Sequence, residues 1–417
     1  MEAKKSSRFI LNLLGIGTAI SLLGDATLYT VLPHPDIVEQ LGITLSMVGL
    51  LLGANRAVRL IINGPVGMLY DRMPRRGLLI TSLSLGACSS IFYALGHGFW
   101  PLLLGRILWG FAWALLWVGG NSVVLDVSSE DNRGRNSGIY QMWFFLGIAT
   151  TSLFGALLTD LFGFRVGQWI SVGVIAMTSL VWYLFLPETR GDKETEEEVI
   201  IETDNSSRVK LPFKVIAVSS FTLFISRFLT WGVLAATTIL WLSDLFGDGV
   251  QISVIFVPIA TFSGMFTVLS NLTSIGSTPF VGSISDKFKR RWSIIGWAII
   301  LGSLGLWLMS GKIRSLALIG AFLVPIASSS TETLIPAVAG DQVPQKLRGR
   351  VLGLINTAGD LGATIGPFAA LGAINSDWLS LGDIYKIGSI GFGVVAILAL
   401  SPFATRKPQE QLPKNRS

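Results

Sequence analysis

The sequence predicts an all-α integral membrane protein with twelve transmembrane helices arranged as two pseudo-symmetric six-helix bundles. Composition is the first reason: 51% of the 417 residues are hydrophobic and 14% are charged, whereas a soluble protein has about 25% charged residues. The mean hydropathy is +0.61, so lipid must cover much of the surface. The second reason is a series of apolar runs long enough to cross a bilayer, and the third is an internal repeat.

The apolar runs predict the helices in order. A spanning helix needs about 20 mostly apolar residues, and twelve such runs begin at about residues 9, 42, 77, 99, 136, 166, 212, 251, 292, 315, 351 and 384. The first run follows Lys4, Lys5 and Arg8, as a signal peptide would. It is too long for a cleaved segment and has no small-residue cleavage pattern, so we expect a retained first helix.

The distribution of basic residues predicts the orientation. Alternate loops, both termini and the central linker hold 24 of the 32 Lys and Arg residues. Cytoplasmic loops are enriched in Lys and Arg, so we expect both termini to be cytoplasmic.

The two halves of the chain match at an offset of 215 residues. The matching pairs include Gly67 with Gly282, Asp71 with Asp286, Arg75 with Arg290, Arg76 with Arg291, and Asp126 with Asp341. This predicts a six-helix bundle at residues 1–187, an acidic cytoplasmic linker at 188–211 and a second bundle with a short tail at 212–417. The first two helices of each half do not match at this offset, so we expect a dozen-residue insertion between Leu242 and Ser277.

Several protein classes are disfavoured by missing residues. Cys88 is the single cysteine, and the two histidines, His34 and His97, fall in predicted external loops. A disulfide, a metal centre and a cofactor are therefore not expected. The sequence also has neither a phosphate-binding G-x-x-x-x-G-K-[ST] loop nor a catalytic Ser/His/Asp constellation. We expect a protein that is not an enzyme and that binds no nucleic acid.

Four segments resemble the major facilitator superfamily. Residues 64–76 (GPVGMLYDRMPRR) resemble its G-x-x-x-D-R-x-x-R-R signature between helices 2 and 3, and residues 282–291 (GSISDKFKRR) resemble the second copy. Residues 104–110 (LGRILWG) resemble the helix 4 motif of proton-coupled drug exporters, and residues 186–190 (LPETR) resemble the P-E-(S/T)-x-R end of helix 6. The resemblance implies a twelve-helix transporter, most like the drug and metabolite exporter branch. It departs from the family's antiporters in helix 5, where residues 147–155 contain no proline.

The loop signature predicts a gating latch, which forms in one arrangement of the bundles and breaks in the other. The latch residues would be Gly67, Asp71, Arg72, Arg75 and Arg76, with Gly282, Asp286, Arg290 and Arg291 in the second half. The alternative is a permanent structural contact.

Charged residues within predicted spans are candidates for function, because an ionisable group at mid-bilayer costs at least ~2.5 kcal/mol. Asp25 and Arg106 lie at similar depths, ~12 and ~10 Å below the external face at 1.5 Å per residue. Arg227 and Glu332 both lie near the midplane. We expect Asp25 or Glu332 to carry a proton and the two arginines to tune it; the alternative is two static ion pairs.

Helix 2 carries two further arginines inside the predicted span. Arg59 and Asp360 lie at similar depths, so we expect them to pair and close the cytoplasmic side. The alternative is that Arg56 and Arg59 bind an anionic substrate. Arg56, Trp109 and Trp113 are candidate substrate-binding residues, although packing explains most of the aromatic residues there.

These features predict a secondary active transporter that works by alternating access. The expected activity is proton-coupled efflux of a small amphipathic molecule or metabolite. One alternative is uptake or facilitated diffusion of a polar or anionic nutrient, and another is a membrane sensor without transport. The expected partners are a small-molecule substrate, protons and the lipid bilayer. We expect a monomer in the plasma or inner membrane.

Overall fold

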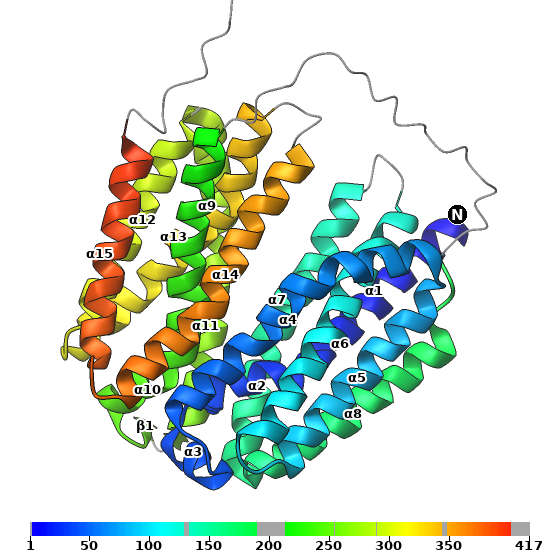
Figure 1. The fold of residues 1–417 in the computed structure, drawn as a ribbon, viewed down its shortest axis with the longest axis horizontal. Helices are drawn as coiled ribbons and strands as arrows, with labels where there is room; N and C mark the ends of the chain where they lie inside the picture. The colour runs from blue at the N-terminus through cyan, green and yellow to red at the C-terminus, as the bar shows by residue number, and fades with distance from the viewer. Residues whose placement is uncertain are drawn as a thin grey trace, which may run out of the picture. The chain divides into compact units, whose positions relative to one another are not determined.

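The computed structural model describes residues 2–128, 133–189, 213–253, 255–288, 290–343 and 348–401, and nearly all of them are helical (Figure 1). Most of the predicted linker and the predicted tail lie outside these residues. A helix satisfies its backbone hydrogen bonds internally, which lipid requires of any segment that it contacts. The apolar runs of the sequence accordingly form helices.

The first half of the chain forms eight helices, two of which together make the first span. They are α1 (Glu2–Ser21), α2 (Leu23–Val31), α3 (Pro35–Leu41), α4 (Leu45–Arg72), α5 (Arg75–Leu95), α6 (Phe99–Asp126), α7 (Arg133–Phe162) and α8 (Phe164–Phe185). The short helix α3 ends at Gly42, whose φ of 65° is in the left-handed region that glycine adopts readily. The hydroxyl of Thr44 then accepts a hydrogen bond from the backbone N–H of Met47 and caps α4.

The second half repeats this pattern with a different connection. Its elements are α9 (Phe213–Arg227), the π-helix η1 (Phe228–Leu234), α10 (Ala235–Phe246), β1 (Gly249–Ile252), β2 (Ile255–Pro258), α11 (Ile259–Phe288), α12 (Arg291–Met309), α13 (Arg314–Gln342), α14 (Arg348–Asn375) and α15 (Leu381–Leu400). The two strands form an antiparallel hairpin with Gly249 opposite Pro258.

Ten helical stretches among the described residues are long and apolar enough to cross a membrane. They include α1 with α2 as one stretch and α9 with η1 and α10 as another. The remaining long helices, α11 and α14, have 30 and 28 residues but are interrupted by Ser, Thr, Gly and Asn. The all-α membrane architecture is as predicted, and the total of twelve spans stays a prediction.

Corresponding helices of the two halves keep a nearly constant separation. Helix α2 ends at Val31 and α10 at Phe246, 215 residues later, while α4 begins at Leu45 and α11 at Ile259, 214 residues later. The expected insertion between Leu242 and Ser277 is therefore wrong: the helices keep the repeat even where their residues no longer match. The hairpin occupies the predicted start of a helix at about residue 251, so α11 begins later than predicted.

Packing within each half follows the same repeat. Helix α5 contacts both α6 and α8, and its counterpart α12 contacts both α13 and α15. The chain divides into two compact units that are described separately below. The first unit is Met1–Ser207, Gly232–Asn271 and Thr364–Trp378; the second is Arg208–Trp231, Leu272–Ala363 and Leu379–Ser417. The domain boundaries expected from the sequence stay predictions.

The first unit contains a close seam between α4 and the end of α14. A Cβ atom on Gly49 would lie 2.7 Å from the Cα atom of Phe368 and from the carbonyl oxygen of Pro367. Alongside this seam, the Asp160 carboxylate on α7 accepts hydrogen bonds from the backbone N–H of Thr261 on α11, at 2.7 Å, and from its hydroxyl. Glycine at the seam lets two helix backbones approach closely.

Candidate functional site

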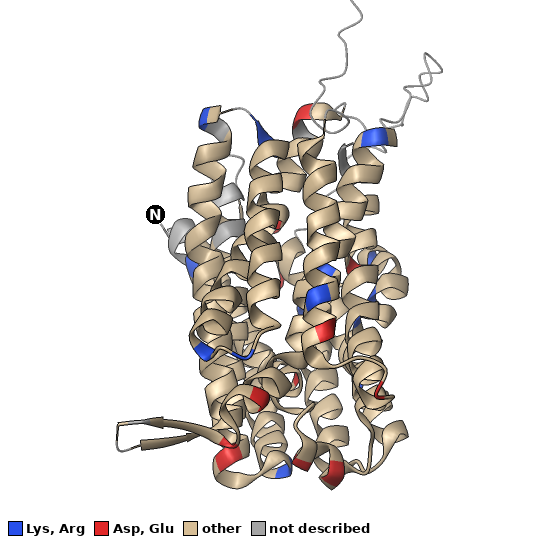
Figure 2. Ribbon diagram, turned by 90° about the vertical axis from the view of Figure 1, so that its left-hand side faces the viewer, with Lys and Arg blue, Asp and Glu red and all other residues tan. Residues whose placement is uncertain are grey.

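Charged positions gather at the ends of the helices, and a few lie along their length (Figure 2). In the first unit, Arg106 on α6 forms an ion pair with Asp25 on α2. The Arg106 side chain is 1% exposed and the Asp25 side chain 13%. Asp25 lies in the first turn of α2, just after the break in the helix at Leu22. A carboxylate is favoured there by the partial positive charge of a helix N-terminus.

The Arg106 guanidinium also bonds to the backbone of α4. Its Nε donates to the carbonyl oxygen of Leu51 at 2.8 Å, and its Nη2 lies 3.4 Å from that of Leu52. The carboxylate and the carbonyls together join α2, α4 and α6 around one guanidinium. This is the arrangement of a structural tie.

Tyr29 completes this cluster, although the sequence gave no reason to select it. Its ring centroid lies 5.4 Å from the guanidinium carbon of Arg106 and 5.3 Å from that of Arg56. The hydroxyl donates to the carbonyl oxygen of Leu52 at 2.7 Å. Tyr29 follows Asp25 by one helical turn on α2, so the predicted burial of Asp25 was the available signal.

In the second unit, Arg227 binds two carboxylates. Its Nε and Nη2 donate to the two oxygens of Glu332 on α13, at 2.7 and 2.9 Å. Its Nη1 donates to Asp360 on α14 at 2.7 Å, and Nη2 also donates to the amide oxygen of Asn356 at 3.0 Å. The Arg227 side chain is 16% exposed, whereas Glu332 is 33% and Asp360 30% exposed.

The helix changes its geometry directly after Arg227. Arg227 ends α9, and the next seven residues form the π-helix η1. Hydroxyl groups surround this point: Ser226 is hydrogen-bonded to Thr331 at 2.8 Å, and Thr230 to Ser328 at 3.3 Å. Short π-helical segments within membrane helices often occur at functional sites.

The structure brings together both pairs that the sequence analysis selected, Asp25 with Arg106 and Arg227 with Glu332. It also gives Asp360 a partner that the sequence did not suggest, because Asp360 bonds to Arg227. Arg59 lies half-buried on α4, in the other compact unit. Its predicted pairing with Asp360 stays a prediction.

The candidate aromatic residues lie in the core of the first unit. Trp109 and Trp113 are 3% and 6% exposed. The ring of Trp113 stacks on that of Trp117 with centroids 5.5 Å apart, and Phe144 contacts both rings. A substrate in this unit would contact the half-buried Trp117 and Phe144 before it reached Trp109.

The loop signature forms a charged cluster within the first unit. Arg75 pairs with Asp126 and donates to the backbone carbonyl of Tyr70 at 3.0 Å. The two carboxylate oxygens of Glu188 accept the backbone N–H groups of Arg75 and Arg76 at 3.0 and 3.1 Å, so Glu188 caps α5. Asp126 and Glu188 were not selected as latch residues, although the recurrence of Asp126 in the repeat was a signal for it.

The second copy of the signature forms a related contact in the second unit. Arg291 bonds to Asp341 at 2.5 Å and lies 3.3 Å from the hydroxyl of Ser285. The arginine that pairs is therefore shifted by one position relative to the first half. Gly67 and Gly282 have open space beside them, Arg72 and Arg290 are exposed, and the side chains of Asp71 and Asp286 lie outside the described residues. The opening and closing of this latch stays a prediction.

Known proteins resemble the chain over most of its length. The inner membrane transport protein YajR of Escherichia coli (strain K12) is 23% identical over 360 residues, covering 84% of this chain and 75% of that protein. The quinolone resistance protein NorA of Staphylococcus aureus (strain MRSA252) is 24% identical over 410 residues, covering 96% of each.

Solved structures share the fold at low sequence identity. A bacterial homolog of the human lysosomal transporter Spinster has a TM-score of 0.71 and 17% identity, covering 95% of this chain and 94% of that chain. The nucleoside transporter NupG has a TM-score of 0.72 and 12% identity, covering 94% and 98%. The family model of the Major Facilitator Superfamily matches residues 14–367 and 260–417. Because that model extends over both halves of a helical membrane protein, the chain belongs to the Major Facilitator Superfamily of membrane transport proteins.

Proposed function

We propose that this protein is a secondary active transporter that works by alternating access and exports a small amphipathic molecule in exchange for protons. The observation that carries this proposal is the Arg227 cluster, in which two carboxylates share one guanidinium within membrane-spanning helices. We assign the proton to Glu332, with Asp360 as its neighbour and Arg227 as the residue that tunes both.

The shared guanidinium makes protonation affordable in free-energy terms. An arginine inside a membrane needs a partner, since an unpaired ion there costs at least ~2.5 kcal/mol. When Glu332 takes up a proton, Asp360 still neutralises Arg227. The cluster therefore has two protonation states, and Arg227 is paired with a carboxylate in both.

The exposure of the carboxylates supports exchange with water. Glu332 and Asp360 are each about one-third exposed, at 33% and 30%. Hydroxyl groups from Thr230 and Ser328 lie beside the π-helical segment and are suited to hold water or a polar part of a substrate. A substrate that bonds to Glu332 or Arg227 would change the balance between the two carboxylates, and this is a physical route to coupling.

The similarity to NorA, named as a quinolone resistance protein, supports export of an amphipathic compound. The basic loops support a plasma or inner membrane location with both termini in the cytoplasm. We further propose that the protein acts as a monomer.

A second candidate is uptake or facilitated diffusion of a polar or anionic nutrient. One observation favours it: the Arg56 guanidinium lies half-buried over the Tyr29 ring, within the transmembrane helix α4. A cation held in this way would attract an anion. In that case Arg56 and Arg59 would bind substrate, as in the alternative drawn from the sequence.

Proton flux in proteoliposomes tests these proposals. Vesicles with an acidic interior and a pH-sensitive dye are exposed in turn to cationic, neutral and anionic compounds. We expect one class to release protons, and we expect Glu332→Gln to lower this release by roughly tenfold or more, which corresponds to about 1.4 kcal/mol. Asp36→Asn is the control, because the Asp36 side chain lies outside the spans and is 87% exposed.

Two results would contradict the assignment. Substrate counterflow without proton movement would establish a facilitator and make both clusters structural. Unchanged proton release in Glu332→Gln, with loss of release in Asp25→Asn, would move the proton site to the first unit.

A further inference from the structure

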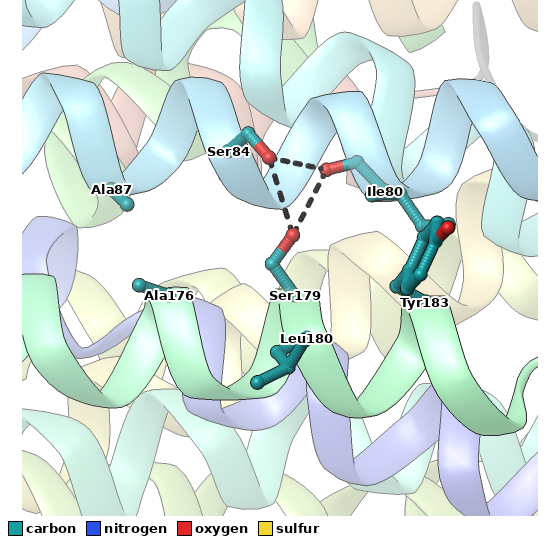
Figure 3. Close-up of a pocket in the computed structure, with 7 residues that line it drawn as sticks. All are labelled: Ile80, Ser84, Ala87, Ala176, Ser179, Leu180 and Tyr183. Carbon is teal, nitrogen blue, oxygen red and sulfur yellow. Dashed lines mark hydrogen bonds between the residues drawn. The ribbon is translucent and has the colours of Figure 1, made fainter.

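A crevice runs along the outer side of the first unit, between α5 and α8 (Figure 3). Its volume is about 410 Å³. Ile80, Ser84 and Ala87 line it from α5, and Ala176, Ser179 and Leu180 line it from α8, with Tyr183 at one end. The hollow arises because the facing residues Ala87 and Ala176 are small, while the side chains of Leu180 and Tyr183 stand beside it.

The polar groups of the crevice are satisfied internally. The hydroxyls of Ser84 and Ser179 are 3.2 Å apart, and each also lies within hydrogen-bond distance of the backbone carbonyl of Ile80, at 3.1 and 3.4 Å. The remaining surface is mostly hydrocarbon. An acyl chain can therefore enter without depriving a polar group of water.

One end of the crevice carries a positive charge. Arg76 lies one helical turn before Ile80 on α5, so it shares the same helix face. Its guanidinium lies 5.7 Å from the centroid of the Tyr183 ring, and its Nη2 donates to the backbone carbonyl of Tyr183. The Nε of Arg76 is buried and has no hydrogen-bond partner among the described residues. An unsatisfied guanidinium nitrogen of this kind attracts an anionic oxygen.

The length of the crevice matches one leaflet of the membrane. Ile80 and Ala87 lie four and eleven residues after Arg76, which corresponds to ~6 and ~16 Å along the helix. Half of the hydrocarbon core measures about 15 Å. The crevice thus extends from a cation at the end of the span to the middle of the bilayer, on the side that the positive-inside rule makes cytoplasmic.

We propose that this crevice binds an anionic phospholipid of the cytoplasmic leaflet, with one acyl chain between α5 and α8 and the phosphate at Arg76. Arg76 then has a role besides the latch to which the loop signature assigned it. The proposal is independent of the transported substrate and of proton coupling.

A second crevice provides an internal comparison. It has a volume of about 480 Å³ and is lined by residues of α1 and α8, among them Leu13, Gly17, Gly173 and Met177. No charged residue lines it. It offers space for an acyl chain without a site for the phosphate, so it should not distinguish lipid headgroups.

Photo-crosslinking in lipid nanodiscs tests the proposal. The full-length protein is reconstituted with either phosphatidylglycerol or phosphatidylcholine that carries a photoactivatable group on one acyl chain, and the crosslinked peptides are identified by mass spectrometry. We expect phosphatidylglycerol to label α5 and α8 at this crevice about fivefold more than phosphatidylcholine, the ratio expected for one arginine near an anionic lipid. The second crevice should label equally with both lipids.

Matched variants separate the two parts of the site. Arg76→Gln should bring the labelling ratio close to one, and Arg76→Lys should retain the preference. Ala176→Trp should remove labelling of this crevice by both lipids. Gly173→Trp, on the same helix but in the second crevice, should leave it unchanged, as should Leu184→Trp at a lipid-facing position that is 60% exposed.

Labelling of the second crevice shows that each variant is folded, except in Gly173→Trp, for which labelling of the first crevice serves this purpose. Equal labelling of this crevice by the two lipids in the wild-type protein would overturn the proposal. So would labelling spread evenly over all lipid-facing helices, or labelling that persists in Ala176→Trp. These wild-type results decide the question even if a variant does not fold.

Discussion

The two compact units each place an arginine among membrane-spanning helices, but they surround it differently. Arg106 has one carboxylate, Asp25, and bonds to two backbone carbonyls of α4; its side chain is 1% exposed. Arg227 has two carboxylates and the amide of Asn356, and its side chain is 16% exposed. The first site is closed and matched one to one, whereas the second is partly open and holds an additional acid.

This difference separates a structural pair from an exchangeable one. Protonation of Asp25 would leave Arg106 buried without an anion, and breaking a buried pair in this way costs about 3–5 kcal/mol. Protonation of Glu332 leaves Asp360 on Arg227. We therefore infer that similar residue types serve stability in the first unit and proton exchange in the second.

The largest effect is expected from removing the charge of Asp25. Asp25→Asn should lower the free energy of unfolding by about 3–5 kcal/mol, because Arg106 keeps its charge in a buried site. Removal of both charges, in Asp25→Leu with Arg106→Met, should restore most of the loss. Thermal unfolding of the purified protein in detergent measures both. A stable Asp25→Asn protein that no longer couples protons would reverse the roles of the two sites.

A smaller effect is expected at the seam that belongs to the same unit as Arg106. Gly53→Ala places a methyl group against the backbone carbonyl of Thr364, and overpacking of this kind typically costs about 1–3 kcal/mol. Gly64→Ala on the same helix is the control, since open space surrounds Gly64. The same unfolding measurement compares the two variants. Equal stability of the variants would show that the seam does not hold the first unit together.

The smallest effect is expected at Tyr29. Tyr29→Phe removes the hydrogen bond to the Leu52 carbonyl but keeps the ring beside Arg56 and Arg106. The loss should be about 1 kcal/mol in the free energy of unfolding, with proton release unchanged. Tyr183→Phe, whose side chain is exposed, serves as the control in unfolding experiments. A strong loss of proton release in Tyr29→Phe would indicate that the first cluster also takes part in transport.

Much of the architecture follows from properties that can be read along the chain. Hydropathy gave the helices, most of them to within a few residues, because lipid imposes the same length and apolar character on every span. The recurrence of Asp126 as Asp341 and of Arg133 as Arg348 gave the duplication. The exceptions have local causes: the hairpin at Gly249–Pro258 is apolar enough to resemble the start of a helix, and the first two helices of each half keep their lengths without keeping their residues.

The sequence by itself determined the membrane class, the duplication, the family resemblance and the two pairs Asp25–Arg106 and Arg227–Glu332. Depth within a span is set by the number of residues from its end, and an ionised group at that depth requires a partner. Only the tertiary structure decided that Asp360 joins Arg227, that Tyr29 lies beside Arg106, and that Arg76 faces a crevice between α5 and α8. These contacts depend on how each helix is rotated and which helix lies next to it, and both are set by packing between residues distant in the chain.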